Sequence, residues 1–205
     1  MKAIITDYQY ENVNSERSII EGAGYELTTF QKKTPDELIP IVKDADAVIT
    51  QYSEITEEVI ANMDHCKLII KYGIGVNNID CNAAAKKGIY VCNVPDYGID
   101  EVSDHACTMM LALGKKLPIL ASALKNGDWG YSSIVPLFRL SQCTLGLVGF
   151  GRIPQMVARK MQAFGMRILT YDPYVSEELA TKYSVTAVSL DTLLKESDFY
   201  LCIAH

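Results

Sequence analysis

The chain has 205 residues, of which 49% are apolar and 21% are charged, values that fit a globular protein of one large or two small domains. Its 25 acidic and 19 basic side chains give a net charge of -6, which argues against nucleic acid or an anionic membrane as a partner. The N-terminus, MKAIITDYQY, turns polar after a few apolar residues, and no later apolar run is long enough to cross a bilayer. The sequence therefore predicts a cytoplasmic protein.

The first half of the chain alternates short apolar runs with amphipathic stretches. We expect strands at residues 2–7, 26–30, 47–50, 67–73 and 90–94. We expect helices in the intervening stretches with helical spacing, at residues 15–22, 35–42, 56–63 and 79–87. Strands and helices that alternate in this way, with nearly continuous apolar strands, predict an α/β fold with a parallel sheet covered on both faces.

The helix expected at residues 35–42 has the clearest start signal. Thr34 stands at the N-cap, Pro35 at the first helical position and Glu37 three residues after the cap. This order predicts a capping box, in which the glutamate side chain reaches back to the amide of the capping residue. Proline is favourable at its position because the N–H that it lacks has no helical partner there.

The alternation of strands and helices ends at residues 94–100, VPDYGID, where proline, glycine and aspartates mark a crossing from one domain to the next. Residues 101–113 then predict one long apolar helix, followed by a second helix and an irregular stretch that ends before residue 144. We place a domain boundary near Gly98, which divides the chain into residues 1–97 and 98–205.

Residues 144–172 have the order of a dinucleotide-binding unit. A buried strand at 144–150 runs into a glycine turn, a helix runs from about Arg152 to Phe164, and a second strand ends at Asp172. Gly149 permits the tight turn and Gly151 lets a pyrophosphate approach the helix N-terminus.

The amides of Arg152 and Ile153 are expected to face that phosphate. Asp172 follows Gly151 by about 20 residues, where a carboxylate accepts hydrogen bonds from the ribose hydroxyls. A carboxylate there also repels a 2′-phosphate, so the sequence predicts NAD as the cofactor in preference to NADP.

Pro154 departs from the G-x-G-x-x-G pattern of such turns, whose third glycine lets the helix pack closely on the strand. Its ring adds bulk at that contact, whereas its missing N–H matters little in a first helical turn. Proline disfavours the α conformation of the residue before it, here Ile153, so we expect the helix to begin a residue late.

Three segments resemble the D-isomer-specific 2-hydroxyacid dehydrogenase family: residues 71–106, with GIG, NNID and NVP; residues 127–130 with 140–174; and residues 193–205, LLKESDFYLCIAH. The resemblance implies a flavodoxin-like substrate domain, a Rossmann dinucleotide-binding domain inserted into it, and an active site in the cleft between them. It also implies that NAD serves as cofactor for interconversion of a D-2-hydroxy acid and a 2-oxo acid.

The resemblance implies site residues in both domains. Ile74 and Gly75 match the loop whose backbone amides hold the substrate carboxylate. A glycine-flanked turn offers N–H groups to an anion, although a plain strand-to-helix turn explains the spacing as well. Asn77 and Lys71 stand where the family often has aspartate and arginine. The expected cofactor residues are Gly149, Gly151, Arg152, Ile153, Asp172 and His205, the last at the rim of the nicotinamide pocket.

The helix at residues 101–113 matches the helix that pairs subunits in this family. The resemblance therefore favours a homodimer, while packing against the chain's own core remains the alternative for its apolar face.

None of His65, His105, His205 and Trp129 is a convincing general acid or base. We expect His65 to lie in a turn, His105 to be packed and hydrogen-bonded on its helix, Trp129 to pack the irregular crossing, and Lys71 to face solvent. The cysteines are scattered without a C-x-x-C pair, so we expect reduced, buried thiols and no metal site; they are Cys66, Cys81, Cys92, Cys107, Cys143 and Cys202.

By resemblance, the histidine–glutamate pair and the arginine of the family's chemistry lie beyond residue 205, as do the end of the sheet and the segment that completes the substrate domain. We therefore expect a fragment or a truncated product that is inactive alone, with no catalytic residue in this chain. The alternative is a non-catalytic NAD-sensing protein similar to the C-terminal-binding corepressors.

Overall fold

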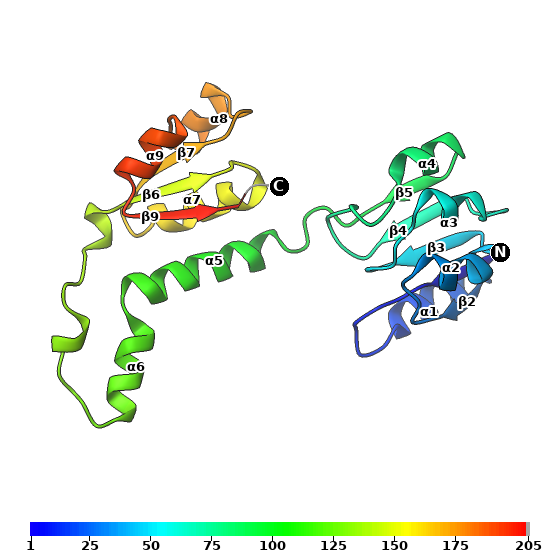
Figure 1. Cartoon of the computed structure of the whole chain (residues 1–205), viewed down its shortest axis with the longest axis horizontal. Coiled ribbons are helices and arrows are strands. Elements are labelled where there is room, and N and C mark those ends of the chain that lie inside the picture. Colours follow the sequence, from blue (N-terminus) through cyan, green and yellow to red (C-terminus); the bar gives the residue numbers. More distant parts are fainter. Residues whose placement is uncertain (204–205) are drawn as a thin grey trace. The chain divides into compact units, whose positions relative to one another are not determined.

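The computed structural model describes residues 1–203 of the chain (Figure 1). His205, expected at the cofactor pocket, lies outside the described residues. The chain divides into two compact units, an N-terminal unit of Met1–Asp96 and a C-terminal unit of Tyr97–His205. None of the described helices alone has the length and apolar character of a bilayer span, and α5 (Ile99–Gly114) and α6 (Leu117–Lys125) reach it only together, across a 61° bend.

The N-terminal unit is a five-stranded parallel sheet in the order β2-β1-β3-β4-β5. Its strands are β1 (Lys2–Ile5), β2 (Glu26–Thr29), β3 (Ala47–Thr50), β4 (Leu68–Lys71) and β5 (Tyr90–Cys92). The helices between them are α1 (Asn14–Gly22), α2 (Pro35–Val42), α3 (Glu57–Ala61) and α4 (Cys81–Lys86). This strand order is the flavodoxin-like one, which confirms the expected fold of the first domain.

Side chains that alternate along the strands build a core on each face of this sheet. Ile4, Val48 and Ile69 pack with α2, α3 and α4 on one face. Ile5 and Ile49 belong to a second cluster, which includes residues of α1, on the other face. The alternation follows from the pleat, which points successive side chains to opposite faces.

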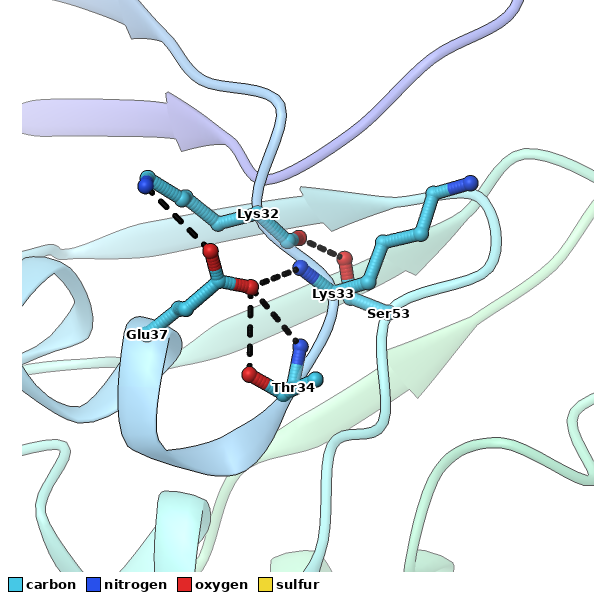
Figure 2. A network of polar contacts seen from close by, with 5 residues as sticks. All are labelled: Lys32, Lys33, Thr34, Glu37 and Ser53. Atoms are coloured by element: carbon cyan, nitrogen blue, oxygen red, sulfur yellow. Dashed lines mark hydrogen bonds and ion pairs between the residues drawn. The ribbon is translucent and has the colours of Figure 1, made fainter.

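The capping box predicted at α2 is present. Glu37 Oε2 accepts hydrogen bonds from the Thr34 amide at 3.3 Å and from the Lys33 amide at 3.2 Å, as Figure 2 shows. These amide bonds, with the Thr34 hydroxyl and the Lys32 ammonium, lower the pKa of Glu37 to about 2. Ser53 Oγ, beyond β3, donates to the Lys32 carbonyl at 2.7 Å, so the network also joins the start of α2 to the sheet.

The C-terminal unit opens with two helices, α5 (Ile99–Gly114) and α6 (Leu117–Lys125), followed by short 3-10 turns at Ser132–Ile134 and Leu140–Gln142. Its strands are β6 (Thr144–Val148), β7 (Arg167–Tyr171), β8 (Thr186–Ala187) and β9 (Phe199–Cys202). The remaining helices are α7 (Arg152–Gln162), α8 (Glu177–Lys182) and α9 (Leu190–Glu196). The parallel order β8-β7-β6-β9 is the Rossmann order 3-2-1-4, as expected.

Helices cover both faces of this second sheet. Leu145 and Leu147 of β6 belong to the core that α5 and α7 share. Gly146, between them, faces α9: a Cβ built there would lie 2.4 Å from Ser197 Oγ and 2.6 Å from Leu193 Cδ2. Glycine at this strand position therefore permits α9 to pack close to the sheet.

Four expectations about single residues are wrong. Helix α7 begins at Arg152 and not late, because Pro154 lies in the first turn, where its ring meets no helical carbonyl. Trp129 is 85% exposed, and His105 is exposed on α5 while its neighbour Asp104 pairs with Lys160 instead. Lys71 is buried at 7% exposure, not solvent-facing.

The cysteine prediction is partly right. All six thiols are free, but only Cys66, Cys107 and Cys143 are buried, whereas Cys81, Cys92 and Cys202 are exposed. His65 is exposed beside β4, as expected.

Candidate functional sites

The turn that joins β6 to α7 has the geometry that a phosphate site needs. Gly149 has φ of +95°, a conformation that favours glycine. A Cβ at Gly151 would meet no other atom within 4 Å, so its side of the turn is open. Phe150 O accepts a hydrogen bond from Gln155 Nε2 at 2.8 Å, and since the peptide is planar and trans, the Gly151 N–H points the opposite way.

Helix α7 presents amides at the open side of this turn. Among residues 1–203, none accepts a hydrogen bond from the amides of Gly151 or Ile153, which lie at the N-cap and in the first helical turn. Free amides at a helix N-terminus attract anions, both as donors and through the helix dipole. Pro154 is buried against the core and leaves these two donors intact.

Asp172 follows β7, and its carboxylate reaches across to the glycine turn. Asp172 Oδ2 accepts a hydrogen bond from the Phe150 amide at 2.7 Å, and Oδ1 accepts one from the Tyr174 amide at 2.8 Å. A carboxylate offers about four acceptor positions, so both oxygens keep capacity for hydroxyl donors. The structure thus brings Gly149, Gly151, Ile153 and Asp172 together at one end of the β6–β7 pair.

The second candidate site is the loop that follows β4. Gly73 has φ of +148°, and its carbonyl accepts a hydrogen bond from the Val94 amide at 3.0 Å. The Ile74 carbonyl accepts one from Asn93 Nδ2 at 2.7 Å. A trans peptide directs its N–H away from its C=O, so the amides of Ile74 and Gly75 point away from Asn93 and Val94.

These two amides are unsatisfied as far as the described residues show. In the part of the chain that the structure describes, no oxygen accepts a hydrogen bond from Ile74 N or Gly75 N. Ile74 is half-buried and Gly75 is exposed, so the donors are accessible to a ligand. Two adjacent outward amides suit a carboxylate better than a neutral group, because hydrogen bonds to an ionised acceptor are the stronger ones.

A buried polar network underlies this loop. Asp7, two residues after β1, accepts hydrogen bonds from the amides of Gln51 at 2.9 Å, Tyr52 at 2.8 Å and Ser53 at 3.2 Å. Burial by itself would raise the pKa of Asp7, but the Ser53 hydroxyl and these amides together lower it below its usual value. Burial lowers the pKa of the nearby Lys71, an effect that Asp7 partly offsets.

Sequence reasoning did not identify the roles of Asp7, Ser53 or Asn78. Asp7 and Ser53 have a positional signal, since each stands within three residues of a strand end and parallel strands bring their carboxyl ends to one edge of the sheet. Asn78 lies seven residues after β4 and has no such signal.

A pocket of about 720 Å³ lies beside the network, between Tyr52 and Asn77. Its wall carries Glu54, Glu57 and Asp80, so it repels a carboxylate and does not compete with the amide loop for one. Within residues 1–203, no three His, Cys, Asp or Glu side chains gather as a metal ion would require.

Helix α5 has two apolar faces. Ala106, Cys107 and Met110 pack on α7, and Lys160 of α7 bridges Asp104 at 2.7 Å and Asp100 at 3.2 Å. The hydrogen bond to Asp104 is the main cause that raises the pKa of Lys160. Core packing therefore explains one face only, because large apolar side chains of α5 and α6 remain exposed: Val102, Met109, Leu113, Leu117, Ile119 and Leu124.

Comparisons with known proteins point to one enzyme family. Residues 4–200 match the model of the family described as D-isomer specific 2-hydroxyacid dehydrogenase, catalytic domain. A D-3-phosphoglycerate dehydrogenase of Methanocaldococcus jannaschii is 35% identical over 201 residues, which are 97% of this chain and 37% of that protein. A glyoxylate reductase of Thermococcus gammatolerans is 38% identical over 181 residues, covering 82% of this chain and 53% of that protein.

Among solved structures, the D-lactate dehydrogenase of Aquifex aeolicus, crystallised with NAD and lactic acid, is similar with a TM-score of 0.86. It is 30% identical, and the match covers 98% of this chain and 60% of that one. The chain thus spans 37% and 53% of the length of the two relatives named and 60% of this solved structure.

Proposed function

Because the chain belongs to the D-isomer-specific 2-hydroxyacid dehydrogenase family, we propose that it carries the carboxylate loop and the cofactor turn of an NAD-dependent oxidoreductase. The reaction converts a D-2-hydroxy acid and NAD⁺ into a 2-oxo acid, NADH and a proton, and runs in both directions. One observation carries the proposal: the outward, unsatisfied amides of Ile74 and Gly75, which suit the carboxylate that every such substrate has.

The residues of the C-terminal unit fit the cofactor. Gly149 and Gly151 keep the turn open, the Gly151 and Ile153 amides provide donors for a pyrophosphate, and Arg152 lies at the start of the same helix. Asp172 has acceptor capacity for the adenine ribose hydroxyls, and its charge disfavours a 2′-phosphate. Bound there, NAD supplies the hydride acceptor. His205 remains a proposed contact at the nicotinamide end.

The residues of the N-terminal unit fit the substrate. The Ile74 and Gly75 amides orient the carboxylate, and the loop's carbonyls are already bonded to Asn93 and Val94, so the donors need no rearrangement on binding. We assign substrate binding to residues 1–97 and cofactor binding to residues 98–205.

The exposed apolar side chains of α5 and α6 support a homodimer. Leu113 is 70% exposed and Met109 50% exposed, and both lie on the side of α5 that α7 leaves uncovered. A second copy of the chain would bury this strip across a twofold axis.

The rival function is that of an NAD-sensing binding protein without catalysis. The relatives named above are dehydrogenases and a reductase, which favours the enzyme. Both functions require the cofactor turn, but only the enzyme requires the carboxylate loop.

The test combines binding and turnover. NADH binding to the chain is followed by cofactor fluorescence, and the product of the complete reading frame that contains residues 1–205 is assayed for NADH oxidation with glyoxylate, pyruvate and hydroxypyruvate. We expect NADH binding in both proteins and turnover in the second. NADH binding without turnover of any 2-oxo acid would favour the sensor, and absence of NADH binding would contradict both functions.

A further inference from the structure

Lys71 ends β4 as a buried cation that forms no ion pair within the described residues, although the charge of Asp7 acts on it from farther away. Its Nζ atom donates hydrogen bonds to the Gln51 carbonyl and to Asn78 Oδ1, the latter at 2.9 Å, and lies 5.3 Å from the centroid of the Tyr52 ring. No carboxylate among the described residues lies within ion-pair distance of it. The three donors of the ammonium thus face two oxygens and one aromatic face, which offset the loss of water.

Asn78 is the partner that joins this cation to the rest of the fold. Its Oδ1 accepts from Lys71, and its Nδ2 donates to the Ser53 carbonyl at 2.7 Å. Its backbone carbonyl accepts a hydrogen bond from the Ile55 amide at 2.8 Å. An amide side chain is needed for this arrangement, because it must accept at one atom and donate at the other.

Lys71 and Asn78 stand at the two ends of the loop proposed to bind carboxylate. The segment between them, residues 72–77, includes Ile74 and Gly75. The contact between their side chains closes the base of the loop and fixes it to Gln51 and Ser53, whose own amides are held by Asp7. Asn93 and Val94 hold the loop on its other side, so the clamp is the second of two supports.

We propose that Lys71 and Asn78 form a buried clamp that holds residues 72–77 in the conformation in which the Ile74 and Gly75 amides face a carboxylate. Lys71 is then a positioning residue for the substrate, which it serves through the backbone of the loop. The inference rests on the proposed function of that loop. It also explains why a lysine is buried here: a shorter or apolar side chain would leave Gln51 O and Asn78 Oδ1 without their donor.

The experiment is a titration of the ¹⁵N-labelled full chain with pyruvate, monitored at the Ile74 and Gly75 amide resonances, with pyruvamide as the ligand that lacks the carboxylate. We expect Lys71→Met to weaken pyruvate binding by about tenfold, a loss equivalent to roughly one hydrogen bond to a charged group. Lys71→Arg, which can reach the same two oxygens, should restore most of the affinity. NADH affinity should stay unchanged in both variants.

Lys87 offers a matched control, because its Nζ also donates to two backbone carbonyls, those of Ile60 at 2.8 Å and Ala61 at 2.7 Å, away from the loop. Lys87→Met should leave pyruvate binding unchanged even where it lowers thermal stability. Asn78→Leu removes the clamp from its other end, and combined with Lys71→Met it should weaken binding no further than either change alone.

Two failures are distinguishable. If pyruvate does not shift the amide resonances of Ile74 and Gly75 in the unmutated chain, the carboxylate assignment of the loop is wrong. The clamp is then tested by comparing ligand-free spectra of the unmutated chain and the variants. It is overturned if Lys71→Met and Asn78→Leu leave the Ile74 and Gly75 resonances where they are in the unmutated chain. If the unmutated chain binds pyruvate and folded Lys71→Met binds it equally well, the clamp is overturned directly. Should Lys71→Met fail to fold, Asn78→Leu and Lys71→Arg provide the same comparison.

Discussion

At the scale of a single residue, we propose that Asp172 decides the choice of cofactor. Its carboxylate already accepts hydrogen bonds from the Phe150 and Tyr174 amides, so it is held at the turn before any ligand arrives. A held carboxylate discriminates between a ribose hydroxyl and a 2′-phosphate without a change of conformation.

We expect Asp172→Ala to weaken NADH binding and to reduce the preference for NADH over NADPH, because it removes both the acceptor and the repulsion. Each loss is on the order of 1–3 kcal/mol, the range for hydrogen bonds to charged groups. Fluorescence titration with both cofactors measures it. Equal affinity of the unmutated chain for NADH and NADPH would contradict the assignment.

Glu37 makes the stability of the N-terminus of α2 depend on pH. Its pKa is lowered to about 2 by the amides of Lys33 and Thr34, so the folded state favours the ionised carboxylate more than the unfolded state does. The stabilisation is fully present above the ordinary pKa of 4.5 and is lost as the pH falls from there through about 2.

Glu37→Gln should therefore lower thermal stability at neutral pH, and the difference from the unmutated chain should shrink as the pH falls below 4.5. Thermal unfolding at several pH values checks this, with Glu26→Gln on the exposed surface of β2 as the control. A difference that stays constant across this range would show that the carboxylate charge has no part in the cap.

At the scale of elements, Gly146 decides how closely α9 packs on β6. A Cβ at this position would lie far inside contact distance of Ser197 Oγ and Leu193 Cδ2, and Ser197 Oγ is itself buried without a hydrogen-bond partner among the described residues. The contact between β6 and α9 is therefore tight, and it includes a buried hydroxyl that makes no hydrogen bond among the described residues.

We expect Gly146→Ala to lower the free energy of unfolding by about 1–3 kcal/mol, the usual effect of overpacking. Adding Ser197→Ala should recover part of the loss, because it removes the closest atom and an unsatisfied hydroxyl. Denaturant unfolding measures both changes. Gly22→Ala in α1, where an added Cβ meets no atom within 4 Å, is the control that should be neutral or stabilising.

Pro154 belongs to the start of α7, where it is buried yet leaves the donors of the turn free. We expect Pro154→Gly to change NADH affinity by no more than a few-fold and to lower stability by about 1–2 kcal/mol, through lost burial and greater freedom of the unfolded chain. Fluorescence titration and denaturant unfolding separate the two effects. A large loss of NADH affinity would show that the ring itself shapes the phosphate turn.

At the scale of the whole molecule, the described residues 1–203 carry the two proposed binding sites but show no histidine paired with a carboxylate. His65 and His105 are exposed, and neither pairs with a carboxylate in the described part of the chain. Hydride transfer to a ketone needs a proton for the developing alkoxide and a positive group at the carbonyl.

We therefore expect the 205-residue chain to bind NADH and to show no measurable reduction of glyoxylate, pyruvate or hydroxypyruvate. Single-turnover NADH oxidation tests this against the product of the complete reading frame. Comparable rates in the two proteins would place the catalytic groups within residues 1–205 and would make His105 and Lys71 the first residues to reconsider.

The sequence by itself predicted the elements of the first unit, the parallel sheets, the capping box and the glycine turn after β6. It did so because these depend on local signals: the period of apolar residues, Thr34 and Glu37 beside a proline, and glycines between a strand and a helix. It did not locate α8, β8 and α9 in the chain, where short amphipathic stretches give weak periodic signals.

Only the tertiary structure decided which side chains meet. Asp7, Ser53 and the pair Lys71 and Asn78 come from three distant parts of the chain, and no spacing rule joins them. The parallel sheet does, by bringing the ends of three strands to one edge. The same holds for Trp129 and His105, whose exposure depends on what other elements cover them. Residue type predicts a tendency to be buried, but burial itself is a property of the packed neighbours.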